Sequence, residues 1–152
     1  MSEHHARIHW QRNDAVFTDQ RYSRTHRWHF DGGAEIAAAA SPSVVSPRFT
    51  DASAVDPEEA FVAAISSCHM LWFLSLAAAA GCCVDSYEDE AVGFLREVDG
   101  KLVIAEVVLR PRLGFSGTPP LPERVHELHE AAHARCFIAN SVRCAIRVES
   151  AD

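Results

Sequence analysis

Short segments in which apolar and polar residues alternate make up much of the chain, and a period of two is typical of strands. Asp31-Gly32 and Asp99-Gly100 each separate two such segments, and Asp-Gly is a dipeptide that favours a hairpin turn. The pattern therefore predicts two hairpins and a strand near the end of the chain. The expected strands are residues 7–12, 22–30, 34–40, 84–98, 101–115 and 143–149.

Two helices are predicted among these strands. Residues 57–80 are apolar on every side, with Asp56 as a capping residue and Gly81 as a stop. Residues 121–135 are amphipathic, and their apolar stripe continues at helical spacing to Cys136. Three strands, a helix, two strands, a helix and a strand indicate an α+β fold rather than a doubly wound sheet.

The first helix has the length of a membrane span. Polar residues interrupt it, however, acidic residues flank it on both sides, and it has no basic cluster that would set an orientation. We therefore expect no membrane partner.

A helix that is apolar all round is buried on every side. One small domain struggles to surround such a helix, so a homodimer is expected.

Composition and charge narrow the class of protein. The chain has 152 residues, of which 48% are hydrophobic and 23% charged, and this predicts one globular domain over residues 1–152. A formal net charge of −7 argues against nucleic acid as the main partner. The first residues lack the apolar core of a signal peptide, so a cytoplasmic location is expected. Five cysteines cannot all pair within one chain, and reduced thiols are the expectation.

Cys68, inside the apolar helix, and Cys136, at the end of the second helix, are candidates for chemistry. Buried cysteines often serve only for packing, and that interpretation stays open for both. A reactive cysteine needs its thiolate, which a fixed cation stabilises. Arg24 offers such a cation because it falls on the aromatic face of the strand predicted at residues 22–30. The alternative is that the Arg24 side chain reaches solvent at the strand edge.

These residues resemble a known family. Asp56-Pro57-Glu58-Glu59 opens a helix that carries Cys68 ten residues after Glu58, and Cys136 stands before a last strand. This arrangement is similar to that of the OsmC/Ohr family of thiol peroxidases. The resemblance implies an OsmC-like α+β fold, in which antiparallel sheets wrap around two long central cysteine-bearing helices of an intertwined homodimer.

The resemblance also implies an activity. Cys68 would be the peroxidatic residue that attacks an organic hydroperoxide, and Cys136 the resolving residue that forms a disulfide with it. A thiol reductant, of dithiol or lipoyl type, would restore both thiols. Arg24 and Glu58 would surround the reactive sulfur, and no metal or organic cofactor is implied. Arg21 and Arg27 lie near Arg24 and remain alternatives to it, and Glu58 would act in its own or in the partner subunit.

Several residues depart from the family or have simpler interpretations. Many members have Cys-Pro at the second site, where this chain has Cys136-Phe137. His69 points about 100° away from Cys68 on a helix, so we read it as a core contact and not as the activating base. Cys82 and Cys83 are read as packing residues, and Cys144 is an alternative resolving residue.

Two other functions remain open. His126, His129 and His133 fall on one helix face and could ligate zinc, with Cys136 as a fourth ligand. His126 and His133 are about 10 Å apart on a straight helix, which leaves an adjacent pair such as His129 and His133. The same cysteines could instead serve a non-enzymatic thiol sensor, or a module that binds an apolar ligand. Sustained turnover with a reductant distinguishes a peroxidase from both.

Overall fold

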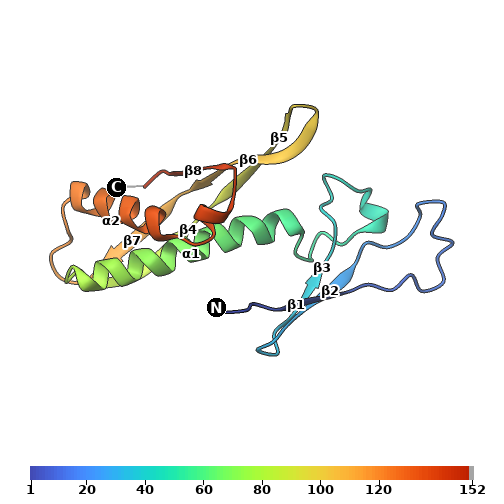
Figure 1. Ribbon diagram of the computed structural model, residues 1–152, viewed down its shortest axis with the longest axis horizontal. Helices are drawn as coiled ribbons and strands as arrows, with labels where there is room; N and C mark the ends of the chain where they lie inside the picture. The colour runs from blue at the N-terminus through green and yellow to red at the C-terminus, as the bar shows by residue number, and fades with distance from the viewer. Residues whose placement is uncertain (151–152) are drawn as a thin grey trace. The chain divides into compact units, whose positions relative to one another are not determined.

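The computed structural model describes residues 1–150, which form two compact units, Met1–Ala60 and a second that begins at Phe61 (Figure 1). The prediction of a single domain over the whole chain stays a prediction. The first unit contains β1 (Ala6–His9), β2 (His26–Phe30), β3 (Glu35–Ala38) and the short helix η1 (Pro47–Phe49). Helix α1 (Pro57–Ala79) begins in the first unit and continues into the second. The remaining elements are β4 (Val84–Asp89), β5 (Val92–Val98), β6 (Lys101–Leu109), β7 (Pro111–Phe115), α2 (Pro122–Arg135), η2 (Ala139–Ser141) and β8 (Ala145–Val148).

The first unit is an antiparallel sheet in the order β1-β2-β3. The strand predicted from residue 22 begins only at His26. The preceding chain instead forms a loop around three aromatic rings, in which Trp10 lies 5.7 Å from Phe17 and 5.5 Å from Tyr22 between ring centroids. Arg24 therefore belongs to the loop before β2 and not to a strand, although alternate residues from Tyr22 to Trp28 are still the less exposed ones.

Helix α1 starts and ends as its sequence predicts. The Asp56 carboxylate accepts a hydrogen bond from the Glu59 backbone N–H at 2.7 Å, and the Glu59 carboxylate accepts one from the Asp56 N–H at 3.1 Å. This reciprocal capping satisfies two amides that a helix start leaves without partners. At the other end Gly81 has φ +77°, and the Cys82 N–H returns to the carbonyl of Ala77 at 2.9 Å.

The second unit packs α1 and α2 against strands. Strand β4 pairs with β7, and β5 pairs with β6, so the predicted long hairpin is present but broken into two ladders. Strand β8 adds to β6 in parallel. Gly93 of β5 lets the sheet approach α1, since a Cβ there would lie 2.6 Å from a methyl carbon of Val62.

One face of α1 is buried, and α2 lies alongside its second half (Figure 1). The buried residues of α1 recur every fourth position, which is the spacing of a single helical stripe: Ile65, His69, Phe73 and Ala77. Phe73 and Ala77 form one core cluster with Val125, Leu128 and Ala132 of α2. The opposite face of α1 stays open in the single chain.

Candidate active site

The two predicted redox cysteines meet in the second unit. Cys68 lies in the middle of α1 and is half-buried, whereas Cys136 caps the end of α2 and is 0% exposed. Burial raises the pKa of the Cys136 thiol, and a hydrogen bond with Cys68 raises it further. The backbone N–H of Ala139 donates to the Cys136 sulfur at 3.4 Å and opposes that shift. This interaction brings the thiols of α1 and of the α2 end together as a facing pair.

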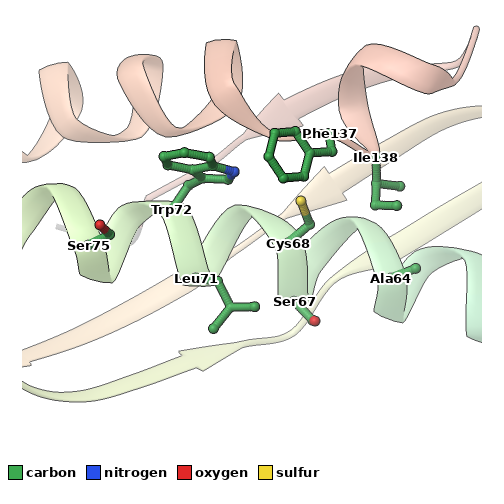
Figure 2. A pocket seen from close by; sticks show the side chains of 8 residues that line it. All are labelled: Ala64, Ser67, Cys68, Leu71, Trp72, Ser75, Phe137 and Ile138. Atoms are coloured by element: carbon green, nitrogen blue, oxygen red, sulfur yellow. The ribbon is translucent and has the colours of Figure 1, made fainter. Parts of the chain in front are cut away.

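Cys68 also faces a cavity of about 540 Å³. Figure 2 shows its sulfur pointing from α1 towards the segment that carries Phe137 and Ile138. The lining is mainly apolar and comes from one side of α1 and from this segment: Ala64, Ser67, Cys68, Leu71, Trp72, Ser75, Phe137 and Ile138. A thiol in such a wall can react with the polar end of a molecule whose remainder is apolar.

An aromatic pair forms one wall of the cavity. The rings of Trp72 and Phe137 meet edge to face, with centroids 5.6 Å apart and planes at 90°. The Arg135 guanidinium lies 5.8 Å from the Trp72 ring centroid, within the range of a cation–π contact. Phe137 is 68% exposed. Helical spacing alone does not place Trp72 opposite Phe137, because the two residues lie on segments far apart in the sequence.

Arg24 is held by its own loop in the first unit. Its guanidinium donates to the carbonyl oxygens of Gln20 and Tyr22 at 2.8 and 2.5 Å, and lies 3.8 Å from the centroid of the Tyr22 ring. Within residues 1–60, Arg24 makes no ion pair. The partners expected for this arginine, a carboxylate or a thiolate, are therefore replaced by main-chain oxygens in that unit.

Glu58 lies inside α1, since the helix begins at Pro57. At the rise of an α-helix, the ten residues from Glu58 to Cys68 correspond to about 15 Å. A glutamate side chain does not span that length along a straight helix. This removes one alternative for Glu58, contact with Cys68 of the same chain through a helix that starts later.

The other three cysteines lie elsewhere in the second unit. Cys144 packs in the cluster around Ile65, Val107 and Leu109, and burial raises the pKa of its thiol. Cys82 packs against the cluster of α1 and α2, and Cys83 is exposed. These positions agree with packing roles for Cys82 and Cys144, whereas the packing role predicted for Cys83 is wrong because its side chain is exposed.

The histidines of α2 are separated by their environments. His129 is 2% exposed and its Nδ1 lies 3.0 Å from Nε2 of His69, which is 1% exposed. His126 is exposed and His133 is half-buried. Among residues 1–150, no group of three or more histidine, cysteine or acidic side chains is arranged to hold a metal ion. This geometry counts against the zinc alternative at His126, His129 and His133.

The helices and strands form an α+β fold. It carries two facing thiols, one half-buried in a long helix and one buried at the end of a second helix. The chain belongs to the OsmC-like protein family, whose family model matches residues 50–151. The predicted fold class, an OsmC-like α+β fold with two helices and antiparallel sheets, is confirmed. The parallel pairing of β8 with β6 is a detail that the sequence did not predict.

Solved structures extend this comparison. An OsmC-like protein of unknown function from Vibrio cholerae is 52% identical, with 99% of each chain covered and a TM-score of 0.95. An organic hydroperoxide resistance protein from Elizabethkingia anophelis is 18% identical, with 99% of this chain and 94% of that chain covered and a TM-score of 0.72. The organic hydroperoxide resistance protein OhrB of Bacillus subtilis is 17% identical, with 98% of each chain covered and a TM-score of 0.66. No curated protein matches the sequence.

Helix α1 is long and apolar enough to cross a membrane by length and composition alone, with a mean hydropathy of 1.7 over its most apolar window. The core helix of a soluble protein passes the same test. In the single chain 22% of that window is buried, on the face that packs against α2 and the strands.

Proposed function

We propose that the protein is a thiol-dependent peroxidase that reduces organic hydroperoxides through Cys68 and Cys136. The observation that carries this proposal is the pairing of a thiol that lines an apolar cavity, Cys68, with a buried thiol, Cys136. The kinship with organic hydroperoxide resistance proteins supports the same substrate class. The cavity suits an apolar substituent, and Cys68 is the nucleophile that faces it.

In the first step the Cys68 thiolate attacks the distal oxygen of the hydroperoxide and the O–O bond breaks. The sulfur is oxidised to a sulfenic acid, and the departing alkoxide takes a proton to become an alcohol. Arg24 is the proposed cation that favours the thiolate and the developing charge on the alkoxide, and Glu58 is its proposed acidic partner. To serve there, Arg24 would exchange its main-chain oxygens for these new partners.

In the second step the Cys136 sulfur attacks the sulfenic sulfur of Cys68. A disulfide forms, and the sulfenic hydroxyl leaves with the Cys136 proton as water. A dithiol or lipoyl-type reductant then reduces the disulfide by thiol exchange and becomes oxidised itself. No resident metal or organic cofactor is required by these steps.

The active form is proposed to be a homodimer whose sites lie between the subunits. Ala64, Ser67, Leu71 and Ser75 form an exposed stripe along α1, spaced by three or four residues, and Leu71 is 62% exposed. Mostly small side chains allow two helices to pack closely. A second copy packed on this stripe would cover the open face of α1. Because the helix separates Glu58 from Cys68 of its own chain, Glu58 would act in the site of the partner.

The test is consumption of cumene hydroperoxide and of hydrogen peroxide by the reduced protein with excess dithiol, comparing wild type with Cys68→Ser. We expect sustained, preferential consumption of the organic peroxide that disappears in the variant. Cys83→Ser is the matched control, since it removes an exposed thiol outside the cavity. A folded wild type that turns over neither peroxide would contradict the proposal and favour a thiol sensor or an apolar-ligand module.

The proposed activity also bears on where the protein acts in the cell. We expect the protein to act in the cytoplasm on an organic hydroperoxide, without nucleic acid or membrane as a partner. Fractionation of cells that express the native chain, followed by detection of the protein in the soluble and membrane fractions, tests the location.

A further inference from the structure

A buried pair of histidines joins the two helices that carry the cysteines. His69 of α1 and His129 of α2 share a hydrogen bond of 3.0 Å, and their rings are stacked with centroids 5.3 Å apart and planes at 10°. The Phe73 ring stacks on the imidazole of His129, and the two ring centroids are 4.3 Å apart. Such a pair is costly to bury unless its hydrogen bond is made.

The pair is set among apolar contacts between the helices. The buried neighbours in this interface are Phe73, Ala77, Val125, Leu128 and Ala132. Apolar contacts of this kind are non-directional and tolerate sliding of one helix along another. A hydrogen bond restricts both distance and direction. The hydrogen bond between the imidazoles therefore specifies how α2 is placed along α1, which the remaining apolar contacts specify only weakly.

The register of α2 on α1 matters here because each cysteine lies on the same helix as one of the histidines or at its end. Cys68 directly precedes His69, and Cys136 follows His129 by seven residues, two turns later on α2. A disulfide requires Cβ atoms about 3.5–4.5 Å apart. A shift of α2 along α1 by a fraction of a turn would take Cys136 outside that range.

We infer that the His69–His129 hydrogen bond fixes the register of α2 on α1 and thereby holds Cys136 within reach of Cys68. Both histidines are positioning residues and neither touches the peroxide. The inference rests on the proposed function for its purpose, because it concerns the resolving step. It assigns a role to two residues that the peroxidase chemistry itself does not use.

The protonation state of the pair suits this role. Burial lowers the pKa of His69 to about 4, and the nearby His133 lowers it while Asp89 and Glu130 oppose the shift. The imidazole is therefore neutral near pH 7. Nδ1 of His69 has no hydrogen-bonding partner within residues 1–150. Two neutral imidazoles form this hydrogen bond when one ring nitrogen donates its proton and the other accepts it.

The experiment measures the equilibrium between the Cys68–Cys136 disulfide and glutathione, with the disulfide identified by peptide mass mapping. The main variant is His69→Leu/His129→Leu, which replaces both hydrogen-bonding partners with apolar groups and can leave stability nearly unchanged. We expect the effective concentration of the two thiols to fall about tenfold, which raises the reduction potential by about 30 mV. His69→Gln keeps a neutral donor in place and is expected to retain the wild-type potential.

Urea unfolding of each variant separates positioning from simple stability. The inference would be overturned by a double-leucine variant that is as stable as wild type and whose two thiols have the same effective concentration as in wild type, within twofold. If that variant does not fold, His69→Met and His69→Gln are compared, since only the glutamine amide can form a hydrogen bond of ordinary strength with His129. If neither folds, ¹⁵N imidazole spectra of the wild type decide: the hydrogen bond must persist in both redox states, and its loss on oxidation overturns the inference.

The readout does not depend on peroxide. A wild type that forms the disulfide with glutathione but consumes no hydroperoxide contradicts the proposed function and leaves the positioning role standing. A wild type that turns over peroxide, with variants that match it in potential, contradicts the positioning role alone.

Discussion

Cys136 is closed off from solvent, whereas Cys68 opens onto the cavity. Because burial raises the pKa of the Cys136 thiol, this residue stays protonated near neutral pH and is a poor nucleophile towards an incoming peroxide. It becomes useful once Cys68 has been oxidised beside it, when the attack is intramolecular. The difference in exposure thus divides the two proposed roles.

Cys136→Ser should separate the two steps. We expect the variant to consume about one equivalent of hydroperoxide and to accumulate a sulfenic acid on Cys68, because the resolving thiol is absent. Trapping with dimedone and intact-mass measurement check this. Cys144→Ala is the control, and accumulation of sulfenic acid in that variant instead would favour Cys144 as the resolving residue.

The proposed role of Arg24 is testable through the reactivity of Cys68. Removal of a charge-assisted hydrogen bond to the thiolate costs about 1.5 kcal/mol, so Arg24→Ala should slow alkylation of Cys68 near pH 7 by roughly tenfold. Alkylation is followed by peptide mass mapping. Arg21→Ala and Arg27→Ala are the matched controls, and a tenfold loss in either of them, with none in Arg24→Ala, would move the assignment.

At the scale of elements, α1 and α2 form the scaffold that brings the two thiols together. The core cluster that the two helices share is apolar, and the His69–His129 hydrogen bond adds a polar contact between them. Ser66 is a further polar residue of α1. Its hydroxyl donates to the Asp89 carboxylate of β4 at 2.5 Å, a contact that no local pattern predicts.

His69 should make the stability of this interface depend on pH. In the unfolded chain His69 takes up a proton at its ordinary pKa of 6.5, whereas in the folded protein it does so only at about 4. The contribution of His69 to the free energy of unfolding should therefore be fully present above about pH 6.5. It should be lost as the pH falls towards 4, by up to roughly 3 kcal/mol. Urea unfolding at several pH values measures this.

The control for that measurement is His126→Gln, which removes an exposed histidine of α2. His69→Gln should remove the His69 part of the pH dependence, whereas His126→Gln should leave it unchanged. Parallel curves for wild type and His69→Gln would show that protonation of His69 is not linked to unfolding.

For the whole molecule, the exposed stripe of α1 predicts an assembly. Leu71→Glu places a charge in the middle of the stripe, and a buried unpaired charge strongly disfavours association. We expect this variant to shift from dimer to monomer in sedimentation velocity runs at micromolar concentration. Leu102→Glu, at an exposed position of β6, is the control and should sediment as wild type does.

The placement of Glu58 leads to a test by subunit mixing. Cys68→Ser and Glu58→Gln homodimers should each have low activity. If Glu58 serves the partner's site, random exchange should restore about a quarter of wild-type activity, because half of the dimers are mixed and each has one intact site. Activity that stays at the level of the unmixed variants would place Glu58 in its own subunit's site or outside the chemistry.

Local sequence determined the elements and most of the candidate residues. The capping pair Asp56 and Glu59 and the stop at Gly81 set α1 nearly to the residue, because helix ends depend on neighbouring side chains and on one backbone conformation. The stripe that reaches Cys136 followed from helical period alone. The resemblance to the OsmC/Ohr family rested on the same short motifs and was confirmed.

Tertiary structure alone decided which of these residues meet. Cys68 and Cys136, and likewise His69 and His129, are more than fifty residues apart in the sequence, and their contact depends on how α2 packs on α1. The loop that withdraws Arg24 from β2 depends on three aromatic rings finding one another. Periodicity encodes the face on which a residue lies, but the partner across an interface is set by packing between distant segments, which a local pattern does not contain.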